Sequence, residues 1–422
     1  MKKITESQQK VQVQKPNIVD SKIAWVVGID IGKNQLSIAL MNKTQTILHR
    51  FKVNNSIAGY KEILGCVDEK TKGRGKVLFA MEPTGHYWMV LGQFFEDYNR
   101  KYVLIHPLAV ARSREVANLN RGKSDPMDAK LIGVLACRGV ATRTQIPGDY
   151  WATLRFLARE FMDREKDIVR EKLRIYSFVE TTLPDIFKVF PNPLCLAARA
   201  CLRTLVNFKG ALKGSLMDFE KQVRKHYTGK RLWVSRVREI YDTLRQNDAM
   251  GLRAGRNAMF CRIIHSLERL EVAEKQQERA KQSLLDFYDK SEYKQYLDSI
   301  QGTTSTTNAL ILGFMGNPTT YDNPKALIKM AGCDPVPNES GKYYGKTPIS
   351  HRGRSLLRKA ADRTAFSIEK RNFVFRNFFH NLLTREKNRL TKRQARIACI
   401  NKYFRIIWVL CNHRVKFNPS LA

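Results

Sequence analysis

Hydrophobic positions become regular at about residue 21, after a polar N-terminal stretch. Short apolar runs then follow one another, each bounded by polar turn residues. These runs lie at 24–31, 35–41, 46–53, 76–82 and 102–105. Runs of this length are typical of strands, and we expect the first three to form an antiparallel meander. The pattern predicts a flexible tail at 1–20 and a folded sheet after it.

Two segments of helical pattern separate the later strands. Residues 59–69 and 86–98 carry apolar side chains at helical spacing. Three hairpin strands followed by alternating helix and strand predict an α/β layer of the ribonuclease-H type. We assign this domain to residues 21–150.

The pattern changes in the region 151–298. Residues 151–179 and 260–288 carry apolar side chains three to four positions apart, with dense mixed charge between them. This pattern predicts long helices that form a coiled-coil or assembly region. Two interpretations remain open: solvated helices packed on a neighbouring domain, or an arm that dimerises.

Residues 299–422 predict a third, mainly helical domain. A glycine turn and Ser/Thr caps at 299–307 precede an apolar helix. Two short helices around Gly302 and Gly316–Asn317 resemble a helix-hairpin-helix, which binds DNA phosphates through backbone N–H groups. An ordinary helical hairpin has the same pattern, so both interpretations stay open.

Charge narrows the class of partner. The 422 residues contain 74 Lys and Arg against 39 Asp and Glu, a net charge of +35. After Gly341, 20 basic residues face only 3 acids. Such an excess predicts attraction to polyanions, and nucleic acid is the partner we favour over a ribosomal or membrane-surface role.

Cysteine usage and the N-terminus indicate a compartment. The eight cysteines form no C-x-x-C pair and no zinc-type spacing with histidine, so we interpret them as reduced core thiols. The N-terminus has no apolar signal segment, and no apolar run approaches the ~20 residues needed to cross a bilayer. We expect a cytosolic protein with no membrane partner.

Four carboxylates stand out in this basic chain. Asp30 and Glu82 close two strands that the expected sheet places side by side. Asp125 and Asp128, three apart at the start of a helix, lie on one helical face. Hard divalent cations prefer such oxygen ligands, and two Mg²⁺ ions can assist phosphoryl transfer. Taken singly, each acid is equally well explained as a turn residue, an ion-pair partner or a first-turn helix residue.

The order of several motifs resembles a known family. GIDIGK at 28–33, MEPTG at 81–85 and KSDPMDA at 123–129 are followed by a distal block. That block contains Gly332, Pro335, Ser340-Gly341, Arg352-Gly353 and Leu357-Arg358. Over about residues 23–405 the chain resembles the DEDD transposases of bacterial insertion sequences, the "one-ten" family of bridge-RNA-guided recombinases.

The resemblance implies a fold and a set of roles. It implies a RuvC-like nuclease domain in which Asp30, Glu82, Asp125 and Asp128 are catalytic and hold Mg²⁺. It implies a helical arm for assembly into a dimer or tetramer, and a C-terminal domain with a serine nucleophile. By motif that residue is Ser340, although the chain has Glu339 and Cys333-Asp334 where many members have a hydroxyl residue and Leu-x. A bridge RNA partner is implied by the family alone.

The serine segment PNESGKYYGK is also compatible with a simple turn or a phosphate ligand. Activation of a serine hydroxyl needs help, and no His–Asp partner is apparent, so the metal site is the expected source. Lys342, Lys346, Arg352 and Arg358 are candidate phosphate ligands. Together these residues predict a DNA transposase. The alternatives are a Holliday-junction-type endonuclease that uses water, and a non-catalytic nucleic-acid-binding protein.

Overall fold

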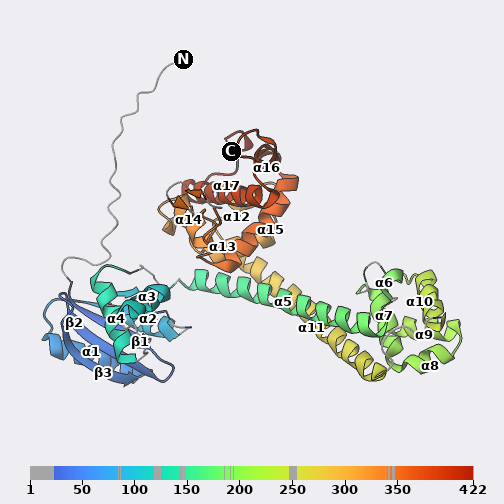
Figure 1. Cartoon of the computed structure of the whole chain (residues 1–422), viewed down its shortest axis with the longest axis horizontal. Helices are drawn as coiled ribbons and strands as arrows, with labels where there is room; N and C mark the ends of the chain where they lie inside the picture. Colours follow the sequence, from blue (N-terminus) through green and yellow to red (C-terminus); the bar gives the residue numbers. More distant parts are fainter. Residues whose placement is uncertain are drawn as a thin grey trace, which may run out of the picture. The chain divides into compact units, whose positions relative to one another are not determined.

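The computed structural model describes residues 23–421, with gaps (Figure 1). The gaps are residues 84, 86, 118–124, 142–145, 147, 185, 191, 193, 247–253, 338, 341, 342, 345 and 346. The chain divides into two compact units, Met1–Ile146 and Pro147–Ala422. Each unit is described by itself below.

The first unit is built on a five-stranded mixed sheet. Its strands are β1 (Ile23–Ile31), β2 (Gln35–Asn42), β3 (Ile47–Asn54), β4 (Lys76–Met81) and β5 (Tyr102–Leu104). The order across the sheet is β3-β2-β1-β4-β5. β1 pairs antiparallel with β2 and β2 with β3, whereas β4 runs parallel to both β1 and β5. The expected meander is confirmed, and β1 lies at the centre of the sheet.

Helices cover both faces of this sheet (Figure 1). They are α1 (Ile57–Thr71), α2 (Tyr87–Asp97), α3 (Pro107–Ala117) and α4 (Asp125–Cys137). Because side chains alternate along a strand, neighbouring residues of β1 belong to different cores. Val27 and Ile29 pack in the core that contains residues of α1 and α2, whereas Val26 packs in the core that contains residues of α4. The sheet is therefore apolar on both faces.

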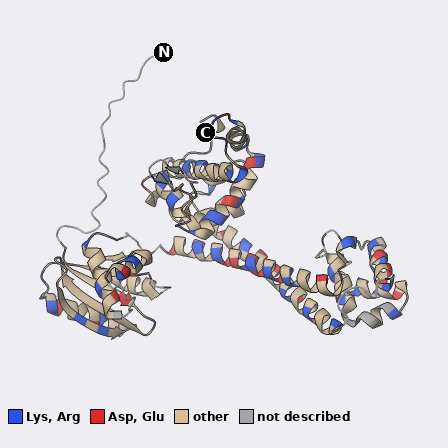
Figure 2. Ribbon diagram, in the orientation of Figure 1, with Lys and Arg blue, Asp and Glu red and all other residues tan. Residues whose placement is uncertain are grey.

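Two long helices dominate the second unit. α5 (Asp149–Thr182) and α11 (Arg256–Tyr288) pack along each other within the chain. Arg164 donates to Gln276 over 3.1 Å, and Glu171 contacts Arg269 at 3.2 Å, so the pairing is antiparallel. Figure 2 shows acidic and basic residues interspersed along the ribbons of both helices. Because the two helices pack on each other, each buries part of the apolar surface of the other.

Shorter helices pack around the end of α5 and the start of α11. They are α6 (Ile186–Val189), α7 (Leu196–Thr204), η1 (Leu205–Asn207), α8 (Phe208–Lys213), α9 (Leu216–His226) and α10 (Val234–Gln246). Their apolar residues form one core with Ile175 and Val179 of α5 and with Ile263 and Leu267 of α11. We call this part of the chain the distal arm.

The start of α5 and the end of α11 pack into the core of the C-terminal helices. The elements of this C-terminal part are α12 (Lys294–Leu297), α13 (Ser305–Met315), η2 (Pro318–Thr320), α14 (Pro324–Ala331), β6 (Glu339–Ser340), β7 (Tyr343–Tyr344), α15 (Ser355–Arg371), α16 (Phe373–Thr384), α17 (Lys392–His413) and η3 (Pro419–Leu421). A Cβ on Gly313 would lie 2.9 Å from both the Leu154 carbonyl oxygen and the Ala158 Cβ. Glycine therefore lets α13 lie directly against α5.

The segment expected to resemble a helix-hairpin-helix is largely internal. Every residue of α13 from Asn308 to Met315 is buried. The turn at Gly302 has φ +91° and lies against α15, where Ser367 donates to the Gly302 carbonyl over 2.7 Å. α13 thus serves as a core helix. The boundaries 150 and 298 stay predictions.

Two further features concern compartment. Among the residues described, no helix is both long and apolar enough to cross a bilayer. The eight cysteines are free thiols, and four of them, Cys201, Cys333, Cys399 and Cys411, are buried. The expected mixed sheet followed by a mainly helical protein is confirmed.

Candidate functional site

Asp30 and Glu82 leave adjacent strands at the same edge of the sheet. In the parallel β1–β4 pair, Gly28 lies opposite Ala80, and Ile29 lies opposite Met81. Asp30 follows Ile29, and Glu82 follows Met81. Since alternate residues of a strand share a face, Asp30 shares the face of Gly28 and Glu82 shares that of Ala80. Both carboxylates therefore belong to the face that α4 covers.

Two glycines bring α4 unusually close to this face. A Cβ on Gly28 would lie 2.1 Å from the Ala129 carbonyl oxygen and 2.6 Å from the Gly133 backbone nitrogen. A Cβ on Gly133 would in turn lie 2.4 Å from the Met41 Cε. Gly28 has no room for a larger residue, because backbone atoms would block it, whereas at Gly133 the Met41 side chain would have to shift. Asp128 is the residue before Ala129, which lies against Gly28 of β1. Gly28 is in turn two positions before Asp30 on the same strand.

Arg114 of α3 holds the Asp128 carboxylate. Its Nε donates to Asp128 Oδ1 over 2.8 Å. The Asp128 side chain is 3% exposed and the Arg114 side chain 24% exposed. A buried carboxylate requires such a partner, because burial without one costs several kcal/mol, on the order of 3–5.

The same guanidinium lies in the field of two more acids. The hydrogen bond to Asp128 is the main cause that raises the pKa of Arg114, and the charges of Asp128, Glu82 and Asp30 raise it further. Partial burial opposes these effects. Three of the four predicted acids therefore gather around one arginine. The sequence analysis missed Arg114, because an arginine 14 residues before Asp128 carries no signal of its own.

The fourth acid, Asp125, begins α4, but its side chain lies outside the described residues. Among the side chains that are described, no group of three or more Asp, Glu, His or Cys residues is arranged to hold a metal ion. The donor chemistry nevertheless suits Mg²⁺, since all four residues offer carboxylate oxygens. Among the described residues, Arg114 contacts Asp128, and the charges of Glu82 and Asp30 also act on its guanidinium.

Ser340 lies in a small hairpin of the second unit. Glu339 and Ser340 form β6, which pairs antiparallel with β7 so that Ser340 lies opposite Tyr343. The side chains of these two strands, and residues 341–342 between them, lie outside what the structure describes. Lys342 and Lys346 fall among the undescribed residues as well. The backbone thus places Ser340 at the end of a strand.

The base of this hairpin is firmly tied. Val336 N donates to Pro348 O over 2.8 Å, and Ser350 N donates to Asp334 O over 2.9 Å. The Ser350 hydroxyl also donates to the Asp334 carboxylate. We call residues 333–350 the serine loop. Its two ends are held together by backbone and side-chain hydrogen bonds.

The two candidate arginines beyond the serine loop differ in their surroundings. Arg358 is half-buried, and its Nη1 donates to the Ala331 carbonyl at the end of α14 over 2.9 Å. Arg352 is exposed. Its guanidinium is therefore better placed to meet a phosphate than that of Arg358.

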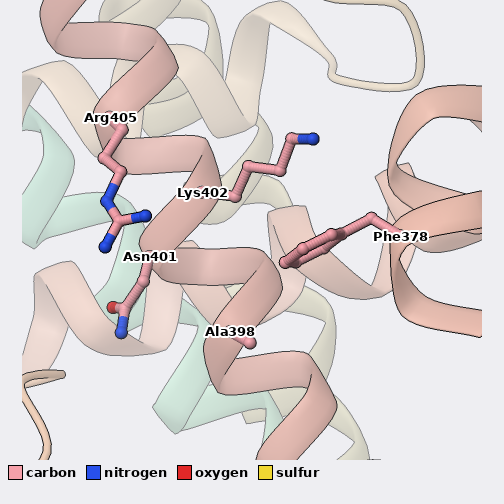
Figure 3. A pocket seen from close by; sticks show the side chains of 5 residues that line it. All are labelled: Phe378, Ala398, Asn401, Lys402 and Arg405. Atoms are coloured by element: carbon pink, nitrogen blue, oxygen red, sulfur yellow. The ribbon is translucent and has the colours of Figure 1, made fainter. Parts of the chain in front are cut away.

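A pocket beside the serine loop was not expected from the sequence. Figure 3 shows Phe378 of α16 facing α17, which carries Asn401, Lys402 and Arg405. With Ala398 these residues line a cavity of about 370 Å³. The Lys402 ammonium lies 4.8 Å from the centre of the Phe378 ring. Asn401 donates to the Cys333 carbonyl over 3.3 Å, which joins the pocket wall to the start of the serine loop.

Two protein-family models match the sequence of this chain. A family model for the IS110 transposases, described as "Transposase", matches residues 27–184. A second, described as "Transposase IS116/IS110/IS902 family", matches residues 294–380. The chain carries the transposase domains of the IS110/IS116/IS902 family. The first match contains all four predicted acids and Arg114, and the second contains Ser340, Arg352 and Arg358.

Two relatives agree with this assignment. The chain is 24% identical to a Streptomyces coelicolor protein named "Mini-circle putative transposase for IS117", over 75% of this chain and 78% of that protein. It is 23% identical to an uncharacterized 44.8 kDa protein of insertion element IS116 from Streptomyces clavuligerus, over 94% of this chain and 96% of that protein. Transposition, with DNA as the partner, is the activity that the family supports.

Proposed function

We propose that this protein cuts and rejoins DNA strands at an insertion sequence, using a Mg²⁺-binding acidic site and Ser340 as nucleophile. The observation that carries the proposal is that Asp30 and Glu82 follow paired residues of β1 and β4 on the face that α4 covers, where Asp128 pairs with Arg114. In a chain of net charge +35, three acids that gather at one sheet edge need a reason, and binding of cations beside a phosphate is one.

The sheet supports the ribonuclease-H type of fold. Its order β3-β2-β1-β4-β5, with three antiparallel strands and two parallel ones, is the arrangement we expect for that type. In this arrangement the acids at the ends of β1 and β4 lie beside each other, and α4 adds Asp128.

Asp30, Glu82, Asp125 and Asp128 would hold the Mg²⁺. When bound, the metal would supply Lewis acidity and neutralise charge on the scissile phosphate. The protein's own residues position the site: Gly28 and Gly133 let α4 lie close to the sheet, and the hydrogen bond from Arg114 orients Asp128. Arg114 also compensates like charges that would otherwise repel one another.

Ser340 would carry out the covalent step. Its Oγ forms a bond to the scissile phosphorus while the bond from phosphorus to the deoxyribose oxygen breaks. The serine proton passes to solvent, and the departing oxygen takes one up. Attack by a hydroxyl of another strand reverses these changes and rejoins the DNA. The paired strands support this role because their base is tied and Ser340 is the last residue of β6.

The proposal includes partners. The serine loop precedes a strongly basic C-terminal segment, and exposed Arg352 together with Lys342 and Lys346 is proposed to bind the DNA backbone. We also propose a bridge RNA guide and assembly as a dimer or tetramer, on the family resemblance. Sequencing the nucleic acid that co-purifies with the full chain tests the guide directly.

The acidic site is tested by conservative variants. Asp30→Asn and Asp128→Asn remove charge without changing shape, and we expect each to lose Mg²⁺-dependent strand cleavage. Asp68→Asn is the matched control, since Asp68 pairs with Arg100 at 2.7 Å elsewhere in the same unit. Normal recombination by both Asp30→Asn and Asp128→Asn would rule out the metal site.

A further inference from the structure

A second positively charged pocket lies on the distal arm. It is a cavity of about 310 Å³ between α5 and α11. Arg174 and Phe178 line it from α5, and Arg262, His265 and Arg269 line it from α11. We call these five residues the arm pocket. Neither family match covers residues 262–269, and the proposed cleavage site uses none of the five.

A buried glutamate holds two of the three arginines of the arm pocket in place. Glu171 of α5 is buried, with a side chain 7% exposed. It contacts Arg174 Nη1 at 2.7 Å and Arg269 Nε at 3.2 Å. Arg269 Nη2 also donates to Ser266 Oγ over 2.8 Å. One buried carboxylate thus orients two guanidiniums whose outer parts remain accessible, at 48% and 52% side-chain exposure.

The third arginine is oriented by an aromatic ring. The Arg262 guanidinium carbon lies 4.6 Å from the centre of the Phe178 ring. Such stacking fixes the plane of a guanidinium and leaves its N–H edge available to a ligand. Arg262 is exposed on its helix, and so is His265 one turn away.

The charges of the pocket do not cancel. Two of the three guanidiniums contact Glu171 and the third stacks on Phe178, so one carboxylate stands against three arginines among these residues. That leaves two positive charges in excess among them. Ion pairs made only to stabilise the helices would match acid to base, as Arg199–Glu274 and Arg203–Glu271 do on the same arm. Fixed guanidiniums in a concave surface suit the tetrahedral oxygens of a phosphate.

We propose that the arm pocket binds the backbone phosphates of a nucleic-acid strand. This inference rests on the proposed function, in which the chain acts on nucleic acid, and it extends the contact surface to the distal arm. DNA and RNA share the phosphodiester that the pocket would recognise. The strand need not be the one that is cut.

A matched pair of double variants tests the pocket. Arg262→Ala with Arg269→Ala removes two pocket charges and leaves Arg174 paired with Glu171. The control, Arg170→Ala with Arg279→Ala, removes two exposed arginines from the same two helices. Arg170 pairs with Asp167 at 3.2 Å and does not line the arm pocket. Both full-length variants carry the same net charge, so long-range attraction falls equally in each.

Binding is measured by fluorescence anisotropy with labelled single-stranded RNA and with labelled duplex DNA, across a series of salt concentrations. For the strand that uses the pocket, we expect the pocket variant to bind about tenfold more weakly than the control. The salt slope should fall by about 1.4 for single-stranded RNA or about 1.8 for duplex DNA, as two lost phosphate contacts require.

If the pocket variant binds one probe more weakly than the control variant does, that probe identifies the strand that the pocket binds. If both double variants lose the same affinity for both probes, the proposal is overturned. Unchanged binding together with a changed oligomeric state by sedimentation would instead make the pocket a contact between copies, which also overturns it. The single variant Arg262→Gln, which leaves the Glu171 pairs intact, repeats the test if the double variant misfolds. Strand cleavage by the wild type is assayed separately, so failure of the pocket and failure of the proposed function are distinguishable.

Discussion

Arg114 donates to Asp128 over 2.8 Å, and the carboxylate that it holds is almost completely buried. Asp30 and Glu82 act on the same guanidinium through their charges. The arginine thereby serves as the counter-ion of an acidic cluster at the edge of the sheet. This relationship joins the fold to the proposed chemistry, and it leads to the first prediction.

Replacing Arg114 with Met should leave Asp128 buried without a partner. We expect the free energy of unfolding to fall by about 3 kcal/mol without divalent cations, because a buried acceptor with charge loses its donor. Addition of Mg²⁺ should restore part of that stability, since a cation can replace the guanidinium. Thermal unfolding with and without Mg²⁺ measures both effects. A loss that Mg²⁺ leaves unchanged would argue against cation binding at these acids.

Gly28→Ala should disturb the site through the backbone. The added Cβ would lie 2.1 Å from the Ala129 carbonyl, so α4 must move away from β1 and carry Asp128 with it. We expect a loss of about 1–3 kcal/mol in urea unfolding, together with loss of activity. Gly65→Ala is the control, because nothing lies within 4 Å of a Cβ there and alanine favours helix α1 by roughly 1 kcal/mol. Equal stability of the two variants would contradict the close contact.

The buried thiol of Cys333 predicts a dependence on alkaline pH. Burial raises the pKa of the Cys333 thiol from its ordinary value of 9.0 to about 11, while the nearby Arg358 charge opposes the shift. A raised pKa in the folded state means that the stability from this group is fully present below pH 9. It is then lost as pH rises toward 11, by about 1.4 kcal/mol per pH unit. Urea unfolding between pH 8.5 and 10.5 should show a shallower decline in Cys333→Ala. Identical slopes would exclude the shift.

The two arginines near the serine loop should separate stability from binding. Arg358→Met removes the hydrogen bond to Ala331 and should cost about 1–2 kcal/mol of stability. Arg352→Ala changes an exposed residue, so stability should stay within about 0.5 kcal/mol, while the salt slope of DNA binding falls by about 1. Denaturation and anisotropy titrations on both variants check this. The reverse pattern would exchange the two roles.

Local pattern predicted much of the fold, and contacts across the chain were the part it missed. The five strands coincide closely with apolar runs between polar turns, because those runs are short and their boundaries carry turn residues. Arg114 was missed because its partner Asp128 comes from another helix. The approach of Gly28 to Gly133 depends on packing more than a hundred residues apart.

The arm illustrates the same limit. Apolar spacing predicted α5 and α11 as long helices, but the antiparallel pairing of Glu171 with Arg269 is a property of the folded chain. The arm pocket follows from that pairing, since its residues come from both helices. In the C-terminal part, the Ser/Thr caps at the start of α13 were recognisable, whereas its complete burial from Asn308 onward was not.

The central claim is that Ser340 becomes covalently joined to DNA. The direct measurement incubates the full chain, its co-purified nucleic acid, Mg²⁺ and end-labelled DNA carrying an element end, followed by a denaturing gel and peptide mapping. We predict a protein–DNA adduct on the peptide that contains Ser340. Ser340→Ala should form no adduct although its DNA affinity stays the same. An adduct of normal yield in Ser340→Ala, or cleavage by the wild type with no adduct at all, would contradict the account.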